Sequence, residues 1–286
     1  MPRKTLALFV LIAASFGGNP AFSQSRPVVA PAPAASPFSY ADMADLATAA
    51  PLVVDARIRA ATPLPPERVP GIAAGLVRIY VEADVVSLIR GTGPLAARIA
   101  WLVDLPRDPR GRAPKLGKLR VLAFARPVTT GQIALVAPDA QLAWDPATEA
   151  LVRRILTEAV RPAAPAQVTG IAKGFHQPGT LPGEGESQFF VETQRDEPVT
   201  LTVLRAPGTA PRWAIAFGEI VDGTAVVPAR DTLGWYRLAC GLPRTLPPER
   251  IAANNETDRA LALADYRFIL AQLGDCRRTR TPPPQR

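Results

Sequence analysis

The sequence contains few of the residues that most catalytic and metal sites require. Its 286 residues include one histidine and two cysteines. A single histidine cannot supply the several nitrogen ligands of a typical catalytic zinc site, and Cys240 and Cys276 lack the Cys-x-x-Cys spacing of zinc or redox motifs. We therefore expect no metal site and no cofactor.

Long hydrophobic runs are also missing. The longest one near the N-terminus, Leu6 to Ala14, is well short of the roughly 20 residues that span a bilayer, so we expect no transmembrane segment. Arg3 and Lys4 precede this run, and Ala21-Phe22-Ser23 follows it as a small-x-small cleavage pattern. Residues 1–23 are thus predicted to be a signal peptide cleaved after Ser23, with a periplasmic or secreted mature protein. An uncleaved anchor or a buried first helix is the alternative.

The charge balance is basic but does not point to nucleic acid. The formal net charge is +8, and the cations are 29 arginines and four lysines. The chain lacks a zinc finger, a recognition helix and an aromatic ribonucleoprotein motif, and an exported protein seldom meets nucleic acid. We exclude DNA and RNA as partners.

The composition favours a packed protein made of short elements. The sequence is 48% hydrophobic, which is enough to build a core, and its 32 prolines disfavour a long helical bundle. Residues 24–37 are rich in Pro and Ala and are predicted to form an extended linker.

The first half of the mature chain has the pattern of a small β domain. Ser39 and Asp42 form a capping signal for a helix over residues 40–49. Apolar and polar residues alternate between Leu76 and Ile89, which is the strongest strand pattern in the chain. Further strands are predicted at residues 52–58, 98–105, 119–125 and 133–137. We expect residues 38–144 to form a small antiparallel OB-like barrel or a sandwich.

The second half is predicted to be an α+β domain. Asp145 and Pro146 begin a connecting helix over residues 145–162. Strands are predicted at residues 167–175, 187–193, 199–204 and 212–221, and two helices follow them. These elements assign residues 163–276 to an α+β domain and residues 277–286 to a disordered tail. The fold class of the whole chain is α+β, mainly β.

The two cysteines are predicted to form one disulfide in an oxidising compartment. Asp231 can cap a helix through Ala239, and Asn255 can cap a second helix over residues 256–273, so each cysteine lies at or just beyond a helix C-terminus. A Cys240–Cys276 bridge would stabilise the fold by about 3 to 4 kcal/mol. Free thiols or a redox pair are the alternatives.

Two resemblances accompany these patterns. A short helix, a strand like residues 52–58, a long strand ending in Ile89-Arg90-Gly91 and a strand containing Val121-Leu122-Ala123-Phe124 resemble exported bacterial domains with a netrin-like OB barrel, over residues 40–140. The resemblance lacks the N-terminal cysteine that some relatives use in inhibition. Through stretches such as Trp101-Leu102-Val103-Asp104 and Trp235-Tyr236-Arg237-Leu238, the whole chain also resembles uncharacterised exported proteins of alphaproteobacteria. That resemblance implies no activity.

Catalysis at neutral pH by an imidazole base could use only His176. The Gly- and Pro-rich segment after it also carries Glu184, Glu186 and Ser187, which could act with it in a periplasmic hydrolase. No Gly-x-Ser-x-Gly elbow is present, and two glutamates in one turn satisfy the spacing of a glycosidase pair by accident. A histidine and acids with no catalytic role are the alternative.

A cation-rich segment between two predicted strands is the candidate binding site. Its cations could attract phosphate or carboxylate groups of an anionic polymer or an acidic partner, or they could simply be solvated. The candidate residues are Arg107, Arg110, Arg112, Lys115, Lys118 and Arg120. We therefore predict an exported, non-enzymatic interaction module that binds an envelope protein or an anionic polymer. The hydrolase using His176 is the alternative.

Overall fold

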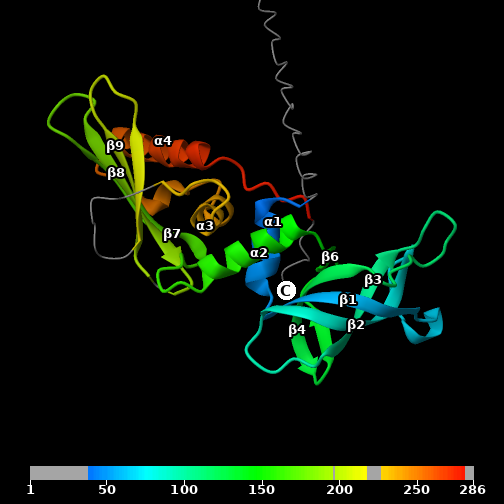
Figure 1. Cartoon of the computed structure of the whole chain (residues 1–286). Coiled ribbons are helices and arrows are strands. Elements are labelled where there is room, and N and C mark those ends of the chain that lie inside the picture. The colour runs from blue at the N-terminus through cyan, green and yellow to red at the C-terminus, as the bar shows by residue number, and fades with distance from the viewer. Residues whose placement is uncertain (1–37, 196, 218–226, 281–286) are drawn as a thin grey trace, which may run out of the picture. The chain divides into compact units, whose positions relative to one another are not determined.

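The computed structural model describes residues 38–195, 197–217 and 227–280. The predicted signal peptide and the predicted linker at 24–37 lie outside the described residues. Figure 1 shows the arrangement of the helices and strands. None of the described helices is both long enough and apolar enough to cross a membrane.

The first sheet closes into the OB-like barrel that the strand pattern predicts. Its strands follow the order β1-β2-β3-β5-β4, and β1 also pairs with β4, so five strands form a closed ring with β6 at the edge. β3 and β5 are parallel, whereas the other neighbours are antiparallel. The strands are β1 (Leu52–Pro63), β2 (Leu76–Arg90), β3 (Arg98–Pro106), β4 (Arg120–Thr129), β5 (Gln132–Leu135) and β6 (Gln141–Ala143).

Two features of the chain let this sheet close. Alternating Val77, Ile79 and Val81 on β2 are buried inside the barrel. β1 has three register shifts against β2, and such bulges bend a strand so that it can pair with a neighbour on each side. β1 also continues to Pro63, beyond the predicted end at residue 58. These last residues pair with β2 but not with β4.

The second sheet has the order β10-β9-β8-β7-β11, and β11 is parallel to β7. Helix α4 packs against β7 and β8, and Phe189 of β8 contacts Tyr266 of α4 with ring centroids 5.4 Å apart. This arrangement confirms the predicted α+β fold class. The elements are β7 (Val168–Pro178), β8 (Gly185–Thr193), β9 (Val199–Arg205), β10 (Arg212–Phe217), α3 (Leu233–Gly241), β11 (Ile251–Ala252) and α4 (Glu256–Leu273).

Helix α1 (Tyr40–Ala49) precedes the barrel strands in the sequence, and helix α2 (Pro146–Ala159) follows them. Both capping predictions are confirmed, because Ser39 and Asp42 form a capping box and Asp145 accepts two backbone N–H groups of α2. Their buried faces belong to the same hydrophobic cluster as the second sheet, whereas the barrel interior is a separate cluster. α1 therefore packs outside the barrel interior, in a cluster that includes residues of the second sheet and residues of β1 and β4.

The predicted disulfide joins Cys240 at the end of α3 to Cys276 just after α4. The cap of α3 differs from the prediction: Thr232 caps this helix through Trp235 N–H, and Asp231 has a left-handed backbone with a φ of 58°.

The predicted disordered tail is wrong at its first residues. Arg278 and Thr279 donate hydrogen bonds to Asp45 and Asp42 of α1, and the fully buried carboxylate of Asp42 needs such donors. The last residues of the predicted tail, 281–286, lie outside the described residues.

Candidate functional site

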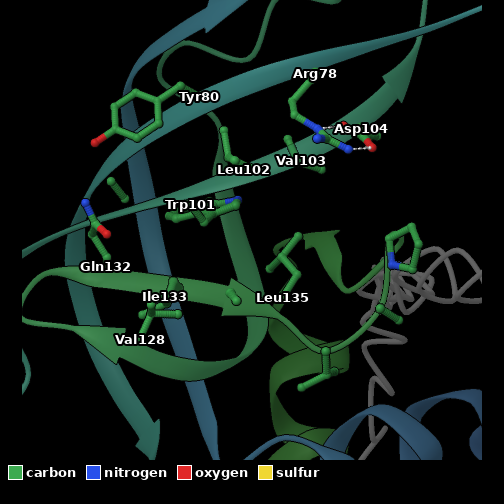
Figure 2. A pocket seen from close by; sticks show the side chains of 15 residues that line it. Arg78, Tyr80, Trp101, Leu102, Val103, Asp104, Val128, Gln132, Ile133 and Leu135 are labelled. Atoms are coloured by element: carbon green, nitrogen blue, oxygen red, sulfur yellow. Dashed lines mark hydrogen bonds and ion pairs between the residues drawn. The ribbon is translucent and has the colours of Figure 1, made fainter. Parts of the chain in front are cut away.

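The barrel carries a pocket of about 580 Å³ between β3 and β5. β3 forms one side, and β5 with the segment that follows it forms the other. We call residues 135–138 the wall and the pocket between the wall and β3 the seam groove. Figure 2 shows Trp101 of β3 and Leu135 of β5 at the pocket, with the Arg78–Asp104 pair near one end and Gln132 near the other.

The seam groove exists because the pairing of β3 with β5 stops early. The two strands pair only at Ala100 and Gln132, although β3 continues to Pro106. Beyond that point the chain after β5 stays with β4, where Val136 N–H donates to the Phe124 carbonyl over 3.0 Å. β3 and the wall therefore separate, and the barrel is open between them.

This opening leaves backbone groups of β3 without a strand partner. Ala100 N–H donates to the Gly131 carbonyl, so the backbone of Ala100 faces β5, whereas Arg107 N–H donates to Gly75 beside β2. Backbone groups alternate in direction along a strand, and Leu102 and Asp104 therefore face the groove. Their N–H and C=O groups have no ladder partner within the described sheet. Such an edge can accept an additional strand.

The groove is lined mainly by apolar side chains. Trp101 and Ile133 reach it from the barrel interior, and Trp101 Nε1 donates to Gln141 Oε1 over 2.8 Å, which fixes the indole. Leu102 and Val128 lie on its outer side and are 48% and 56% exposed. Large exposed apolar residues gathered at one groove are typical of a binding surface.

The charges in the groove cancel. Among the described lining residues, the charged ones are Arg78 and Asp104, which form two hydrogen bonds of 2.7 Å each. The hydrogen bonds from Arg78 lower the pKa of Asp104, so this carboxylate stays ionised at neutral pH. A neutral, apolar groove with free backbone groups suits an extended peptide better than a polyanion.

The structure divides the predicted cation site. Arg120 is held by contacts within the protein: it forms two hydrogen bonds with the fully buried Asp55, and its guanidinium lies 3.6 Å from the Trp144 ring centroid. The hydrogen bonds to Asp55 raise the pKa of Arg120. Arg120 is therefore part of the fold, and its inclusion in a binding site is not supported by this geometry.

The other cations lie in the segment between β3 and β4. Arg112 pairs with Asp108, and Arg107 donates to the Gly111 carbonyl. Within the described part of the chain, the side chains of Arg110, Lys115 and Lys118 make no hydrogen bond or ion pair. These three exposed residues are what remains of the predicted anion site.

The residues of the hydrolase alternative come together only in part. His176 Nδ1 lies 2.9 Å from Ser187 Oγ, and Ser187 donates to Asp265 Oδ2 over 2.6 Å. Arg205 also donates to Asp265. Glu184 instead accepts the N–H groups of Thr180 and Leu181, and Glu186 accepts from Gln188.

This order of groups differs from that of a hydrolase. In a Ser-His-acid triad the histidine lies between the other two groups and takes the serine proton. Here the serine lies in the middle, donates its hydroxyl hydrogen bond to Asp265 and is fully buried. The cluster satisfies buried polar groups and offers no nucleophile to a substrate.

Sequence reasoning missed Asp265 and the seam groove. Asp265 is fully buried and shares the inner face of α4 with Ala262, Tyr266 and Ile269. In the sequence, an acidic residue at helical spacing among these apolar residues would have indicated a buried carboxylate. The groove had no local signal, because it depends on where the pairing of two strands ends.

Within residues 38–195, 197–217 and 227–280, no three His, Cys, Asp or Glu side chains are grouped as a metal site would require. A comparison of this chain with models of protein families and with curated protein sequences finds no match.

Proposed function

We propose that this chain is an exported, non-enzymatic interaction module that binds an extended segment of an envelope protein in the seam groove. The observation that carries the proposal is the free edge of β3, where Leu102 and Asp104 present unpaired backbone groups beside an apolar pocket. The bound segment would add a strand to the free edge of β3, in the space between β3 and the wall. The disulfide and the N-terminal sequence pattern support export, because disulfides persist in oxidising compartments.

The geometry favours one orientation for the bound segment. The segment would pair with β3 alone, because the wall is hydrogen-bonded to β4, so it is either antiparallel or parallel to β3. Antiparallel pairing is slightly more stable per residue, and we expect that orientation. Alternate side chains of the segment would then face Trp101 and Ile133 on the inside and Leu102 on the outside.

The same geometry favours a protein segment over an anionic polymer. Arg78 and Asp104 neutralise each other in the groove, so it has little attraction for a polyanion. A polymer would have to bind Arg110, Lys115 and Lys118, which are exposed and lie outside the lining of the seam groove.

The test is selection of peptides by the disulfide-bonded protein without residues 1–23. A displayed library of random peptides is panned on it, and the affinities of the selected peptides are measured by calorimetry. We expect sequences in which apolar residues alternate. N-methylation of successive backbone nitrogens should weaken binding at every second position, because strand addition uses main-chain hydrogen bonds.

Two matched variants locate the binding site. Leu102→Glu introduces a charge at the groove and should weaken binding by about tenfold or more. Leu204→Glu changes a leucine of similar exposure on β9, 46% against 48%, and should leave binding within about twofold. Selected peptides that bind both variants equally, or that lose affinity on N-methylation without a period of two, would refute strand addition at the groove. Retention of heparin by Arg110, Lys115 and Lys118, with no selected peptide, would favour the polymer instead.

A further inference from the structure

We infer that Arg280 is a positioning residue that holds the wall of the seam groove in place through Asp139; this inference rests on the proposed function. Asp139 directly follows Pro138, the last residue of the wall. The Arg280 guanidinium donates to both carboxylate oxygens of Asp139 through Nε and Nη2. Its side chain is only 6% exposed, so this pair is largely shielded from water on the arginine side.

The wall needs support from this side. Its inner contact is with β4, where Val136 N–H donates to Phe124. No ladder joins it to β3, because the β3–β5 pairing ends at Gln132. The distance between the wall and β3 therefore depends on contacts outside the sheet, and a planar, two-pronged arginine–carboxylate pair fixes geometry better than a single hydrogen bond.

Arg280 is itself held by a segment that is fixed before it reaches the barrel. We call residues 276–280 the C-terminal strap. Its first residue, Cys276, is bonded to Cys240 of α3, and Arg278 forms two hydrogen bonds with Asp45 of α1. Arg280 N–H donates to Asp42 over 3.1 Å. In Figure 1 the strap is the red segment that leads from α4 toward α1.

The strap thus connects the disulfide to the groove through covalent and hydrogen bonds. It begins at the disulfide, crosses α1 and ends on the residue next to the wall. The strap residues, which do not contact the bound peptide, would thus affect its affinity by holding the wall in position. Loss of the Arg280 side chain should release the wall while the strap stays attached at Asp42 and Asp45.

The test compares three variants of the disulfide-bonded protein without residues 1–23 by hydrogen exchange and by peptide affinity. Arg280→Ala should raise amide exchange in residues 132–139 by about tenfold or more and weaken a peptide selected on the unchanged protein by about tenfold, mainly through faster dissociation. Arg280→Lys keeps the charge and should recover part of both effects. Arg277→Ala is the matched control and should leave both readouts unchanged, because this exposed strap arginine makes no side-chain hydrogen bond or ion pair in the described part of the chain.

The outcomes separate this inference from the proposed function. Unchanged exchange in residues 132–139 of Arg280→Ala would refute the inference, and so would an increase spread equally over β7, β8 and β9, which indicates only lower global stability. Increased exchange in the wall with unchanged peptide affinity would also refute it. If no peptide binds the unchanged protein, the proposed function fails, whatever the exchange of the wall.

Discussion

Asp42 provides the sharpest test of the way the two ends of the described chain are joined. Its buried carboxylate accepts hydrogen bonds from Ser39 at the start of α1 and from the backbone N–H groups of Thr279 and Arg280. Burial alone raises the pKa of this carboxyl, but the hydrogen bonds from Thr279, Ser39 and Arg280 outweigh burial and lower its pKa to about 2. The ionised form is therefore bound more tightly in the folded than in the unfolded chain.

The size and the sign of the effect follow from that pKa. A decrease from 3.8 in the unfolded chain to about 2 in the folded chain corresponds to about 2.5 kcal/mol of stability. Because the folded pKa is the lower one, this contribution is fully present above a pH of about 4 and is lost as the pH falls toward 2. Asp42→Asn removes the titrating charge, so its stability deficit should depend on pH in the same way.

The assay is urea unfolding of the wild-type protein and of Asp42→Asn between pH 7 and pH 2.5. We expect a deficit of about 2 to 3 kcal/mol at neutral pH that falls below about 1 kcal/mol at pH 2.5. Asp275→Asn is the control, because the side chain of Asp275 is 75% exposed and should contribute less than about 0.5 kcal/mol. A deficit of equal size at both pH values would contradict the assignment to a charged acceptor.

Three further predictions concern separate parts of the fold. Replacement of both Cys240 and Cys276 by serine should lower the free energy of unfolding by about 3 to 4 kcal/mol in urea, because the bridge closes a loop with a sequence separation of 36. Arg120→Ala should cost about 3 to 5 kcal/mol in the same assay, since it leaves the buried Asp55 unpaired, whereas Arg110→Ala should change stability by less than about 0.5 kcal/mol. Ser187→Ala should cost about 1 to 3 kcal/mol, and nitrogen NMR of the single histidine should find the proton of neutral His176 on Nδ1 in the wild-type protein, because Ser187 donates to Asp265 and can only accept from the ring.

The elements that could be predicted are those fixed by local patterns. The alternation of β2, the capping box of α1 and the asparagine cap of α4 each act within a few residues, and each appears in the structure where the sequence placed it. The pairing of Cys240 with Cys276 was also predictable, because these are the only two cysteines. The number and spacing of the strands predicted a small barrel or a sandwich, and the pairing of β1 with β4 makes it a closed barrel.

Local sequence patterns could not predict the candidate site, because the site depends on contacts between residues that are distant in the sequence. Arg120 closes the same cation-rich stretch as Lys115 and Lys118, and its pairing with Asp55, far earlier in the chain, has no signal in the local sequence. The seam groove depends on β5 leaving β3 after Gln132 and staying paired with β4. The strap likewise connects residues at opposite ends of the described chain, and its sequence has the composition of a disordered tail.

The glycine at position 185 has a different role in the structure from the one that the sequence suggests. In the sequence it belongs to a Gly-rich segment that could display His176 on a loop, but in the structure a Cβ at this position would lie 2.7 Å from the Cε1 and Nε2 atoms of the His176 ring. Gly185→Ala should therefore push the imidazole away from Ser187 and cost about 1 to 3 kcal/mol in urea unfolding. Gly93→Ala is the control, because a Cβ there meets nothing within 4 Å, and it should change stability by less than about 0.5 kcal/mol. Equal stability of the two variants, with unchanged nitrogen shifts of His176, would mean that the imidazole does not occupy the space beside Gly185.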